Sequence, residues 1–214
     1  MLPRDLSVPQ TRQWFILLCQ AMIDEQDALT RADQAIGDGD HGIGISRGFG
    51  AVKLKLQESD FATLDLLFNT IGKALLISIG GASGAVFGSL FVGGAKALKE
   101  RTVFDAASLA DLLKHGLRAV QERGKAEVGD KTIVDALKPA AERALEVQTD
   151  SLDKALAEVV SAAGQGLETT RNLQARFGKA RPLGERAIGH LDPGALSFTL
   201  MLQHLSSLLC RVAD

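Results

Sequence analysis

Residues 33–42, DQAIGDGDHG, place three carboxylates and one imidazole among glycines. The carboxylates belong to Asp33, Asp38 and Asp40, and the imidazole belongs to His41. Two like charges about 5 Å apart repel by roughly 3 kcal/mol at an effective dielectric constant of ~20, so such a segment requires a cation. Oxygen ligands suit a hard ion, Mg2+ or Ca2+, better than zinc. Because protein-bound magnesium usually shares its shell with phosphates, a nucleotide is the expected co-ligand.

The same segment has two other interpretations. Gly37, Gly39 and Gly42 match the dinucleotide-binding fingerprint, but that fingerprint follows a strand, and the pattern before residue 33 is helical. Its carboxylates would also repel a pyrophosphate without a metal between them, so we reject this interpretation. The second interpretation is a solvated acidic turn in which Asp38 caps the next helix. The residue types alone leave it open.

Two glycine-rich segments suit a ligand. Residues 80–84, GGASG, lack bulky side chains and let a ligand approach the backbone, although tight helix packing explains these glycines equally well. Residues 124–132, GKAEVGDKT, form a turn into a helix N-terminus, which suits an anion, while Asp130 as a simple helix cap is an equal alternative. One extra residue separates the glycine from the lysine, and no strand precedes them, so this is not a P-loop.

The loop 173–194 is long, irregular and basic. Its positive charges suit phosphate, although a solvated basic loop is the commoner outcome; they come from Arg176, Lys179, Arg181 and Arg186. The chain shows no serine–histidine–acid or cysteine–histidine constellation, and no covalent nucleophile or other catalytic residue is identified. Metal carboxylates, small-residue turns and a basic flap are what phosphoryl transfer by positioning and charge neutralisation requires.

The composition indicates a globular protein and excludes several partners. At 214 residues, we expect a single domain over 1–214 that buries roughly 70% of its unfolded surface. A net charge of −2 and only ten aromatic residues (nine Phe, one Trp) argue against nucleic acid and anionic membranes as partners. Cys19 and Cys210 lie in apolar helical patterns without a CxxC motif, which predicts packing roles in a reducing compartment. With no signal peptide, the expected location is cytoplasmic.

One stretch resembles a membrane helix. The 22 residues between Lys73 and Lys96 carry no charge, and Gly80, Gly84 and Gly88 form a GxxxGxxxG pattern. A helix end followed by a new helix start, with Ser83 as its cap, is the better interpretation. We therefore expect two buried helices here and no membrane span in the chain.

Apolar residues at three- and four-residue spacing predict about eight helices and no strand of useful length. The predicted helices span 8–31, 43–56, 61–79, 83–99, 106–122, 131–148, 152–172 and 193–212. Ser7 and Gln10 form a capping box before the first helix, and Asp192 followed by Pro193 marks the start of the last. Pro139 falls inside the sixth helix, where we expect a kink.

Together these segments resemble the L (nucleotide-binding) subunit of dihydroxyacetone kinase. The resemblance extends from about residue 11 to about residue 212, in the family's order and spacing. Its matching stretches are 36–42, 47–49, 80–84, 123–127, 129–132, 183–186 and 188–195. It implies an all-α barrel of eight antiparallel helices with the nucleotide at one end. It also implies that Asp33, Asp38 and Asp40 hold Mg2+, two ions being expected, against the phosphates of ADP or ATP.

The resemblance further implies a nucleotide pocket drawn from several segments. Its residues are His41, Gly42, Ile43, Gly44, Ala82, Ser83, Gly84, Gly124, Thr132, Ile133, Lys179, Asp192, Pro193 and Gly194. Two positions depart from the family pattern. Gly44 stands where some relatives carry asparagine, and Lys179 replaces an arginine, which gives a point charge in place of a planar fork.

The function implied is a phosphotransferase subunit that passes a phosphoryl group from Mg-bound nucleotide to dihydroxyacetone on a separate K subunit. In one branch of the family, ADP stays bound and is recharged by a phosphotransferase-system protein; in the other, ATP binds and exchanges. A standalone L-type chain favours the first branch. Alternatives are an ATP-dependent subunit acting on dihydroxyacetone or another short keto sugar such as erythrulose, and a nucleotide-loaded regulatory module. A homodimer is left open.

Overall fold

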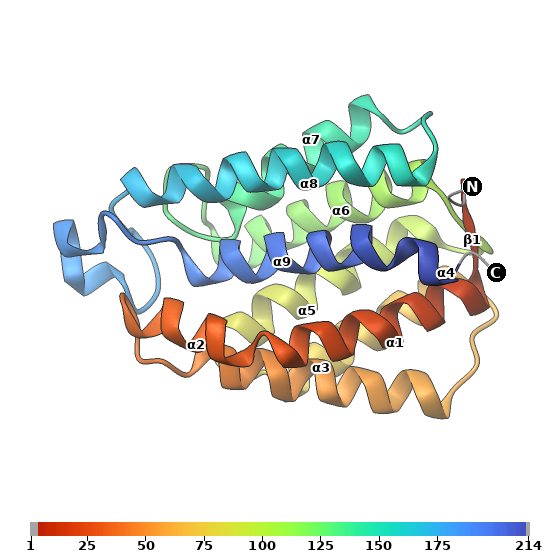
Figure 1. Ribbon diagram of the computed structural model, residues 1–214, viewed down its shortest axis with the longest axis horizontal. Coiled ribbons are helices and arrows are strands. Elements are labelled where there is room, and N and C mark those ends of the chain that lie inside the picture. The colour runs from red at the N-terminus through yellow and green to blue at the C-terminus, as the bar shows by residue number, and fades with distance from the viewer. Residues whose placement is uncertain (1–3, 213–214) are drawn as a thin grey trace.

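A computed structural model describes residues 4–212 of the chain, and these residues form an elongated helical barrel (Figure 1). The predicted all-α fold is confirmed. In the described residues, the α-helices are α1 (Val8–Asp24), α2 (Gln26–Gln34), α3 (His41–Glu58), α4 (Leu64–Ser78), α5 (Gly81–Ala95), α6 (Ala106–Gly124), α7 (Val134–Glu146), α8 (Leu152–Thr169) and α9 (Pro193–Leu208). Short 3-10 segments are η1 (Lys96–Leu98), η2 (Thr170–Asn172), η3 (Arg181–Ala187) and η4 (Leu209–Val212).

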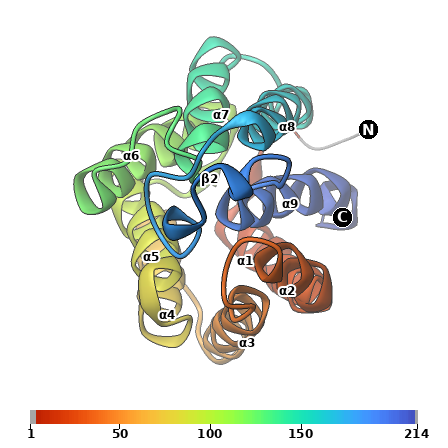
Figure 2. The ribbon, with the colours of Figure 1, turned by 90° about the vertical axis from the view of Figure 1, so that its left-hand side faces the viewer.

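The helices close into a ring. Going round it, α1, α3, α4, α5, α6, α7, α8 and α9 each pack on the next, and α9 packs back on α1, as the end-on view shows (Figure 2). The short helix α2 continues the column of α1 and packs on α3 and α9. Successive columns alternate in direction. As a result α3, α5, α7 and α9 all begin at one end of the barrel, whereas α1, α4, α6 and α8 begin at the other (Figure 1).

The predicted first helix, 8–31, is in fact two helices. The break lies at Glu25, whose backbone has φ −79° and ψ 0° and whose side chain lies 3.0 Å from Nε2 of His204 on α9. Several predicted ends also move by a few residues. The helix expected from residue 131 begins only at Val134, because Lys131 has a φ of 59° and cannot continue a right-handed helix. Pro139 lies inside α7, as predicted.

The caps of the first and the last α-helix, α1 and α9, were predicted correctly. The backbone N–H of Ser7 donates to Oε1 of Gln10 at 3.0 Å, and the Gln10 N–H donates back to Oγ of Ser7 at 3.4 Å. At α9, Oδ2 of Asp192 accepts the N–H of Ala195 at 2.7 Å, with Pro193 at the first helical position. Each pair satisfies helix N–H groups that would otherwise lack acceptors.

A short strand pair, missed by the sequence analysis, ties the chain start to the loop before α6. Strand β1 (Leu6–Ser7) pairs antiparallel with β2 (Val103–Phe104), so that Leu6 faces Phe104. Two residues are too few to show an alternating pattern.

An aromatic cluster fills the core near the end where α1 and α4 begin. The rings of Phe15 and Phe68 meet edge to face at 5.1 Å between centroids, and Trp14 lies 5.9 Å from Phe104. The indole N–H of Trp14 donates to the carbonyl oxygen of Leu205 at 2.9 Å, which links α1 to α9. This cluster fixes the columns of the barrel relative to one another.

The two cysteines differ in their surroundings. Cys19 is buried in the core, as its predicted packing role requires. Cys210 is exposed, and so that prediction was wrong for it: it lies in the 3-10 segment η4, which turns this side chain outward.

The uncharged stretch 74–95 forms the end of α4 and all of α5, as predicted, with Gly80 at a φ of 82° between them. The glycines allow close packing, since a Cβ at Gly88 would lie 2.7 Å from Cβ of Leu76. The predicted cap was wrong: Gly80 is the N-cap of α5, and Ser83 lies inside the first turn with its hydroxyl facing α3.

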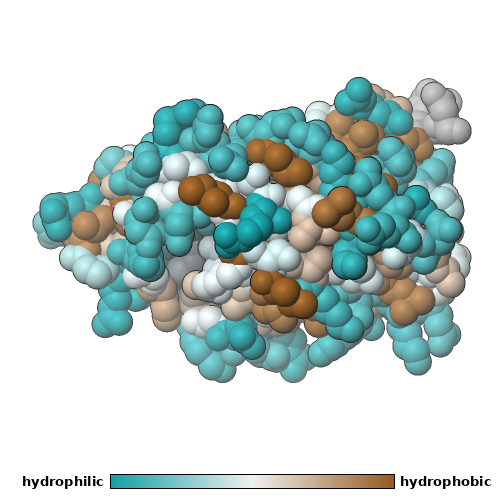
Figure 3. All heavy atoms as spheres, turned by 90° about the horizontal axis from the view of Figure 1, so that it is seen from below, coloured by the Kyte–Doolittle hydropathy of each residue, from teal (hydrophilic) through white to brown (hydrophobic). Residues whose placement is uncertain are grey.

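Among the described residues, one helical segment, Pro193–Val212, is long and apolar enough to cross a membrane, and half of it is buried inside the fold. Burial of this kind is what a core helix of the barrel requires. On the face formed by α3 and α4, apolar side chains are scattered among hydrophilic ones and do not form a continuous belt (Figure 3).

Candidate functional site

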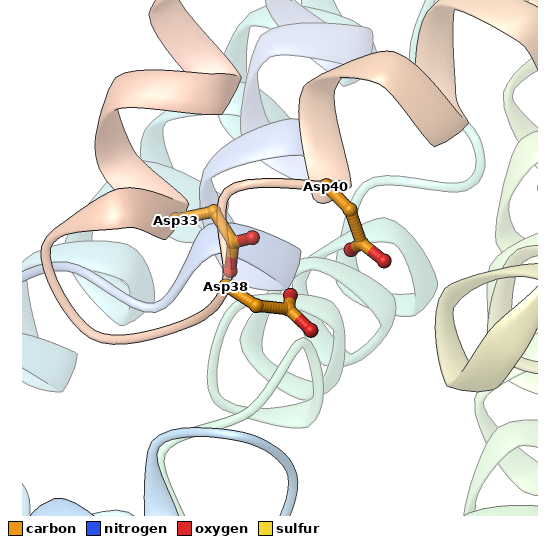
Figure 4. Close-up of side chains that lie close together, drawn as sticks. All are labelled: Asp33, Asp38 and Asp40. Atoms are coloured by element: carbon orange, nitrogen blue, oxygen red, sulfur yellow. The ribbon is translucent and has the colours of Figure 1, made fainter.

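The acidic segment is the turn between α2 and α3. Asp33 comes from the last turn of α2, and Asp38 and Asp40 come from the turn itself. One carboxylate oxygen from each residue lies within 4.8 Å of the other two, and the three side chains converge on one side of the loop (Figure 4). Glycine is required beneath them, because a Cβ at Gly37 would lie 2.2 Å from Oδ1 of Asp33, and Gly39 has a φ of 77°.

The three carboxylates have different partners. Asp33 is buried, and its Oδ2 accepts the backbone N–H of His41 at 3.3 Å. Asp38 is exposed and forms an ion pair with Lys179, whose hydrogen bond holds the pKa of that carboxyl below its ordinary value. Asp38 therefore does not cap α3; the N-cap residue is Asp40, without a side-chain cap hydrogen bond. A metal ion bound here would compete with Lys179 for Asp38.

A cavity of about 600 Å3 opens beside these carboxylates, within the range of about 300–1,000 Å3 typical of small-molecule sites. The N-termini of α3, α5, α7 and α9 contribute to its wall through His41, Ala82, Val134 and Pro193. Helix N-termini present free N–H groups and partial positive charge, which suits a polyphosphate. The alternating direction of the columns is what brings all four to the same end.

Most of the predicted pocket residues line this cavity. They are Asp33, Asp38, Asp40, His41, Ile43, Gly44, Ala82, Ser83, Gly124, Thr132, Ile133, Lys179, Asp192, Pro193 and Gly194. Gly42 and Gly84 do not line it. A Cβ at Gly42 would lie 2.2 Å from the carbonyl oxygen of Gln26, and one at Gly84 would lie 3.3 Å from that of Leu76. Both are packing glycines between helices.

His41 joins three of the helices at the cavity. Its Nδ1 lies 3.1 Å from Oγ of Ser83 on α5, and its Nε2 lies 3.1 Å from Oγ of Ser197 on α9. Either ring tautomer satisfies both contacts, since each hydroxyl can donate or accept. Burial lowers the pKa of His41, and the carboxylates of Asp33 and Asp40 oppose this shift. The neutral ring therefore acts as a crosslink between α3, α5 and α9.

The opposite wall is the turn before α7. Its backbone is organised by Asp135, whose carboxylate accepts the N–H of Gly129 at 2.6 Å and that of Thr132 at 2.7 Å. Asp130 does not cap the helix, contrary to one predicted alternative. It accepts the N–H of Glu127 at 2.8 Å and lies 3.3 Å from the guanidinium of Arg176.

Asp192, the N-cap of α9, has an unusual environment for a carboxylate. Desolvation raises its pKa to about 7, with backbone hydrogen bonds from α9 and the ammonium of Lys131 acting in the other direction. Its position places the first backbone groups of α9 at the cavity wall.

The loop between η2 and α9, residues 173–191, is here called the flap. Two of its basic residues form ion pairs with the rest of the fold: Lys179 pairs with Asp38, and Arg176 pairs with Asp130. Its own small apolar cluster, separate from the main core, includes Ala175 and Ala187 and packs on Ile36 of the acidic turn. The basic residues expected to face phosphate thus include two that pair with acidic residues of the fold.

Sequence reasoning missed several residues of the cavity wall. They include Arg47, Val86, Phe87, Val120, Lys131 and Phe177. Val86, Phe87 and Val120 follow helical spacing and read as core, whereas Phe177 lies in the flap. Arg47 lay in a stretch matching the family, and its guanidinium donates to the carbonyl oxygens of Ser78 and Ile79 at 2.6 Å each, which holds the end of α4 at the site.

Comparison with known proteins identifies similar chains. The DAK2 domain family matches residues 35–207. The "PEP-dependent dihydroxyacetone kinase 1, ADP-binding subunit DhaL" of Listeria innocua is 39% identical over 189 residues, which cover 88% of this chain and 90% of the relative. The corresponding Escherichia coli subunit is 38% identical over 203 residues, which cover 94% of this chain and 97% of the relative.

A solved structure is also similar. The crystal structure of the dihydroxyacetone kinase from C. freundii in complex with AMP-PNP and Mg2+ matches with a TM-score of 0.73 and 26% identity. The match covers 92% of this chain, which spans only a third, 33%, of that kinase.

Proposed function

Because this chain belongs to the DAK2-domain family of dihydroxyacetone kinase subunits, we propose that it is the nucleotide-binding subunit that delivers the phosphoryl group. The donor is ADP or ATP held in the cavity, and the acceptor is dihydroxyacetone bound to a separate K subunit. The relatives' names, PEP-dependent and ADP-binding, favour a nucleotide that stays bound and is recharged by a phosphotransferase-system protein.

One observation carries this proposal: the three carboxylates border the cavity at which four helix N-termini meet. Carboxylates alone would repel a polyphosphate. Helix N-termini alone would attract any anion. Together they fit a polyphosphate that carries divalent cations, which is the usual form of a nucleotide in phosphoryl transfer.

The donor set fits magnesium. Asp33, Asp38 and Asp40 offer only oxygen atoms, and two of the three are exposed enough to share an ion with phosphate and water. We propose two Mg2+ ions there. When bound, such ions neutralise charge on the phosphoryl group being transferred.

The chain's own residues supply binding and orientation. Val86, Phe87 and Val120 give the cavity an apolar wall for a base, while the start of α5, which has no side-chain cap, presents backbone N–H groups at Ala82 and Ser83. Lys179 brings a positive charge to the acidic turn from the flap. The C. freundii kinase contains chain well beyond the part matched here, which supports placing the acceptor on another unit.

Mass spectrometry of the purified protein after extensive dialysis tests this proposal. ADP that survives dialysis supports the recharged branch, whereas an empty protein that turns over ATP with its K partner supports the exchanging branch. A protein that binds neither nucleotide in the presence of Mg2+ contradicts both. A loaded protein that transfers nothing to dihydroxyacetone or erythrulose with either donor and the K partner would instead be a regulatory module.

A further inference from the structure

A buried ammonium group that the proposed function does not use lies at the wall of the cavity. Lys131 stands in the turn before α7 and is only 2% exposed. Its backbone φ of 59° lies in the left-handed region that non-glycine residues rarely adopt. Burying an ammonium group is costly unless acceptors replace its water shell, so its partners identify what it does.

The partners of Lys131 are the two ends of the flap. Its Nζ donates to the carbonyl oxygen of Thr170, just before the flap, and to that of His190, near its end, at 2.5 Å each. Burial lowers the pKa of Lys131, and the carboxylates of Asp192 and Asp135 oppose this shift. One side chain thus holds together backbone segments that are separated by the whole flap.

Two more hydrogen bonds close the base of the flap. The N–H of Gly189 donates to the carbonyl oxygen of Arg171 at 2.7 Å, and the N–H of Asp192 donates to Oγ1 of Thr170 at 3.0 Å. These contacts hold the two ends of the flap together. Among these contacts, the hydrogen bonds of Lys131 attach both ends of the flap to the turn before α7.

The far side of the flap reaches the acidic turn. Lys179 pairs with Asp38, and the cluster around Ala175 and Ala187 packs on Ile36. The flap therefore bridges the cavity from a base anchored at Lys131 to a tip at the three carboxylates. We therefore expect a shift at the base to displace Lys179 relative to those carboxylates.

We propose that Lys131 is a positioning residue that clamps both ends of the flap and thereby sets how long a nucleotide stays bound. Its ammonium acts on the ligand through the flap. The residence time rests on the proposed function, whereas the clamping of the flap is a property of the protein alone. The two parts can be measured separately.

The test compares Lys131→Met, which keeps the length of the side chain and removes its charge, with the unaltered chain. Limited tryptic digestion reports opening of the flap through cleavage after Arg176, Lys179 and Arg186. Displacement of a fluorescent ADP analogue in Mg2+ reports dissociation. We expect both rates to rise by about tenfold or more, since cleavage of a segment follows the population of its open form. The association rate should change little.

Two control variants separate clamping from general destabilisation. Leu67→Ala removes buried contacts in α4, near the other end of the barrel, and should lower Tm without raising flap cleavage. Lys138→Met neutralises a lysine that lies on α7 in a surface ion pair with Glu142. It should change neither rate.

A second variant keeps the inference testable if Lys131→Met does not fold. Gly189 has a φ of 94°, and no heavy atom lies within 4 Å of a Cβ built there, so Gly189→Ala strains the base without a clash. It should raise both rates, by less than Lys131→Met. Unchanged flap cleavage in a folded Lys131→Met or in Gly189→Ala, or equal cleavage in Leu67→Ala, would overturn the clamp. An unaltered chain that binds no nucleotide would refute the proposed function while leaving the cleavage result valid.

Discussion

The two ends of the barrel differ in the residue types that fill their interiors. Where α1 and α4 begin, the interior is filled by Trp14, Phe15 and Phe68, whose rings meet edge to face or through Phe104 of β2. Where α3, α5, α7 and α9 begin, the interior is a cavity bordered by carboxylates, glycines and a flap. Apolar packing stabilises the first end, whereas the second end leaves charges and backbone groups for a ligand.

This difference teaches that stability and binding should separate by position along the barrel. Changes at the aromatic end should lower the free energy of unfolding and leave nucleotide affinity intact in the folded molecules. Changes at the cavity end should lower nucleotide affinity and leave the free energy of unfolding nearly unchanged. His41 is where the two requirements meet, because it is both a structural crosslink and part of the cavity wall.

The largest effect is expected at the aromatic end. Phe68→Ala should lower the free energy of unfolding by about 4 kcal/mol, because it removes a fully buried ring and leaves a void. Chemical denaturation followed by circular dichroism measures this loss. Affinity for Mg-ADP, measured by calorimetry under conditions where the variant is folded, should stay within about twofold; a loss like that of a site variant would break the comparison.

The converse variant is Asp38→Ala. Removing an exposed carboxylate of the acidic turn should weaken Mg-ADP binding by on the order of a hundredfold or more and abolish retention of the nucleotide through dialysis. The Tm of the ligand-free protein should hardly change. Asp27→Asn, at an exposed position on the neighbouring helix α2, is the matched control. Full retention with magnesium still bound in Asp38→Ala would count against the metal assignment.

His41→Phe should affect both properties. The substitution removes two hydrogen bonds and leaves the hydroxyls of Ser83 and Ser197 without their partner, which should lower the free energy of unfolding by about 2 kcal/mol. Nucleotide affinity should fall as well, because the starts of α3, α5 and α9 are no longer held together. If denaturation and calorimetry show that only one property changes, His41 does not combine a structural role with a binding role.

The smallest effect concerns pH. The pKa of Asp192 is raised to about 7 in the folded protein, above its value of about 3.9 in the unfolded chain. The folded state therefore binds this proton more tightly, so the carboxyl destabilises the fold above pH 7, and this destabilisation is relieved as pH falls from 7 toward 4. Asp192→Asn keeps a capping side chain and should raise stability at pH 8 by about 1 kcal/mol.

Denaturation curves of the ligand-free protein between pH 5 and pH 8 check this effect. The substituted chain should lose part of the pH dependence in this window. Identical pH profiles for Asp192→Asn and the unaltered chain would mean that Asp192 does not titrate there.

Features determined by neighbouring residues were predictable from the sequence. The acidic turn, the capping box at Ser7 and the N-cap at Asp192 depend on side chains within a few positions of one another. Most helices were also predicted within a few residues, because their apolar spacing is local. The resemblance to the dihydroxyacetone kinase L subunit was confirmed by the family and by its relatives.

Features that depend on distant partners were not predictable. The break at Glu25 accompanies a contact with His204, and the crosslink at His41 depends on Ser197; each pair is far apart in the sequence. The role of each glycine could not be predicted either. Gly42 and Gly44 look alike in the sequence, yet Gly42 packs against α2 and Gly44 lines the cavity. Only the arrangement of the helices distinguishes them.

The closed ring also determines where the chain can be extended. Because an even number of alternating columns returns to its starting side, the described chain begins and finishes at the aromatic end, where Arg4 accepts a hydrogen bond from Leu152 and Val212 is buried (Figure 1). A fusion partner joined at either terminus would therefore emerge opposite the cavity mouth and leave it accessible. This geometry would keep the cavity open whether the module is a separate chain or part of a longer polypeptide.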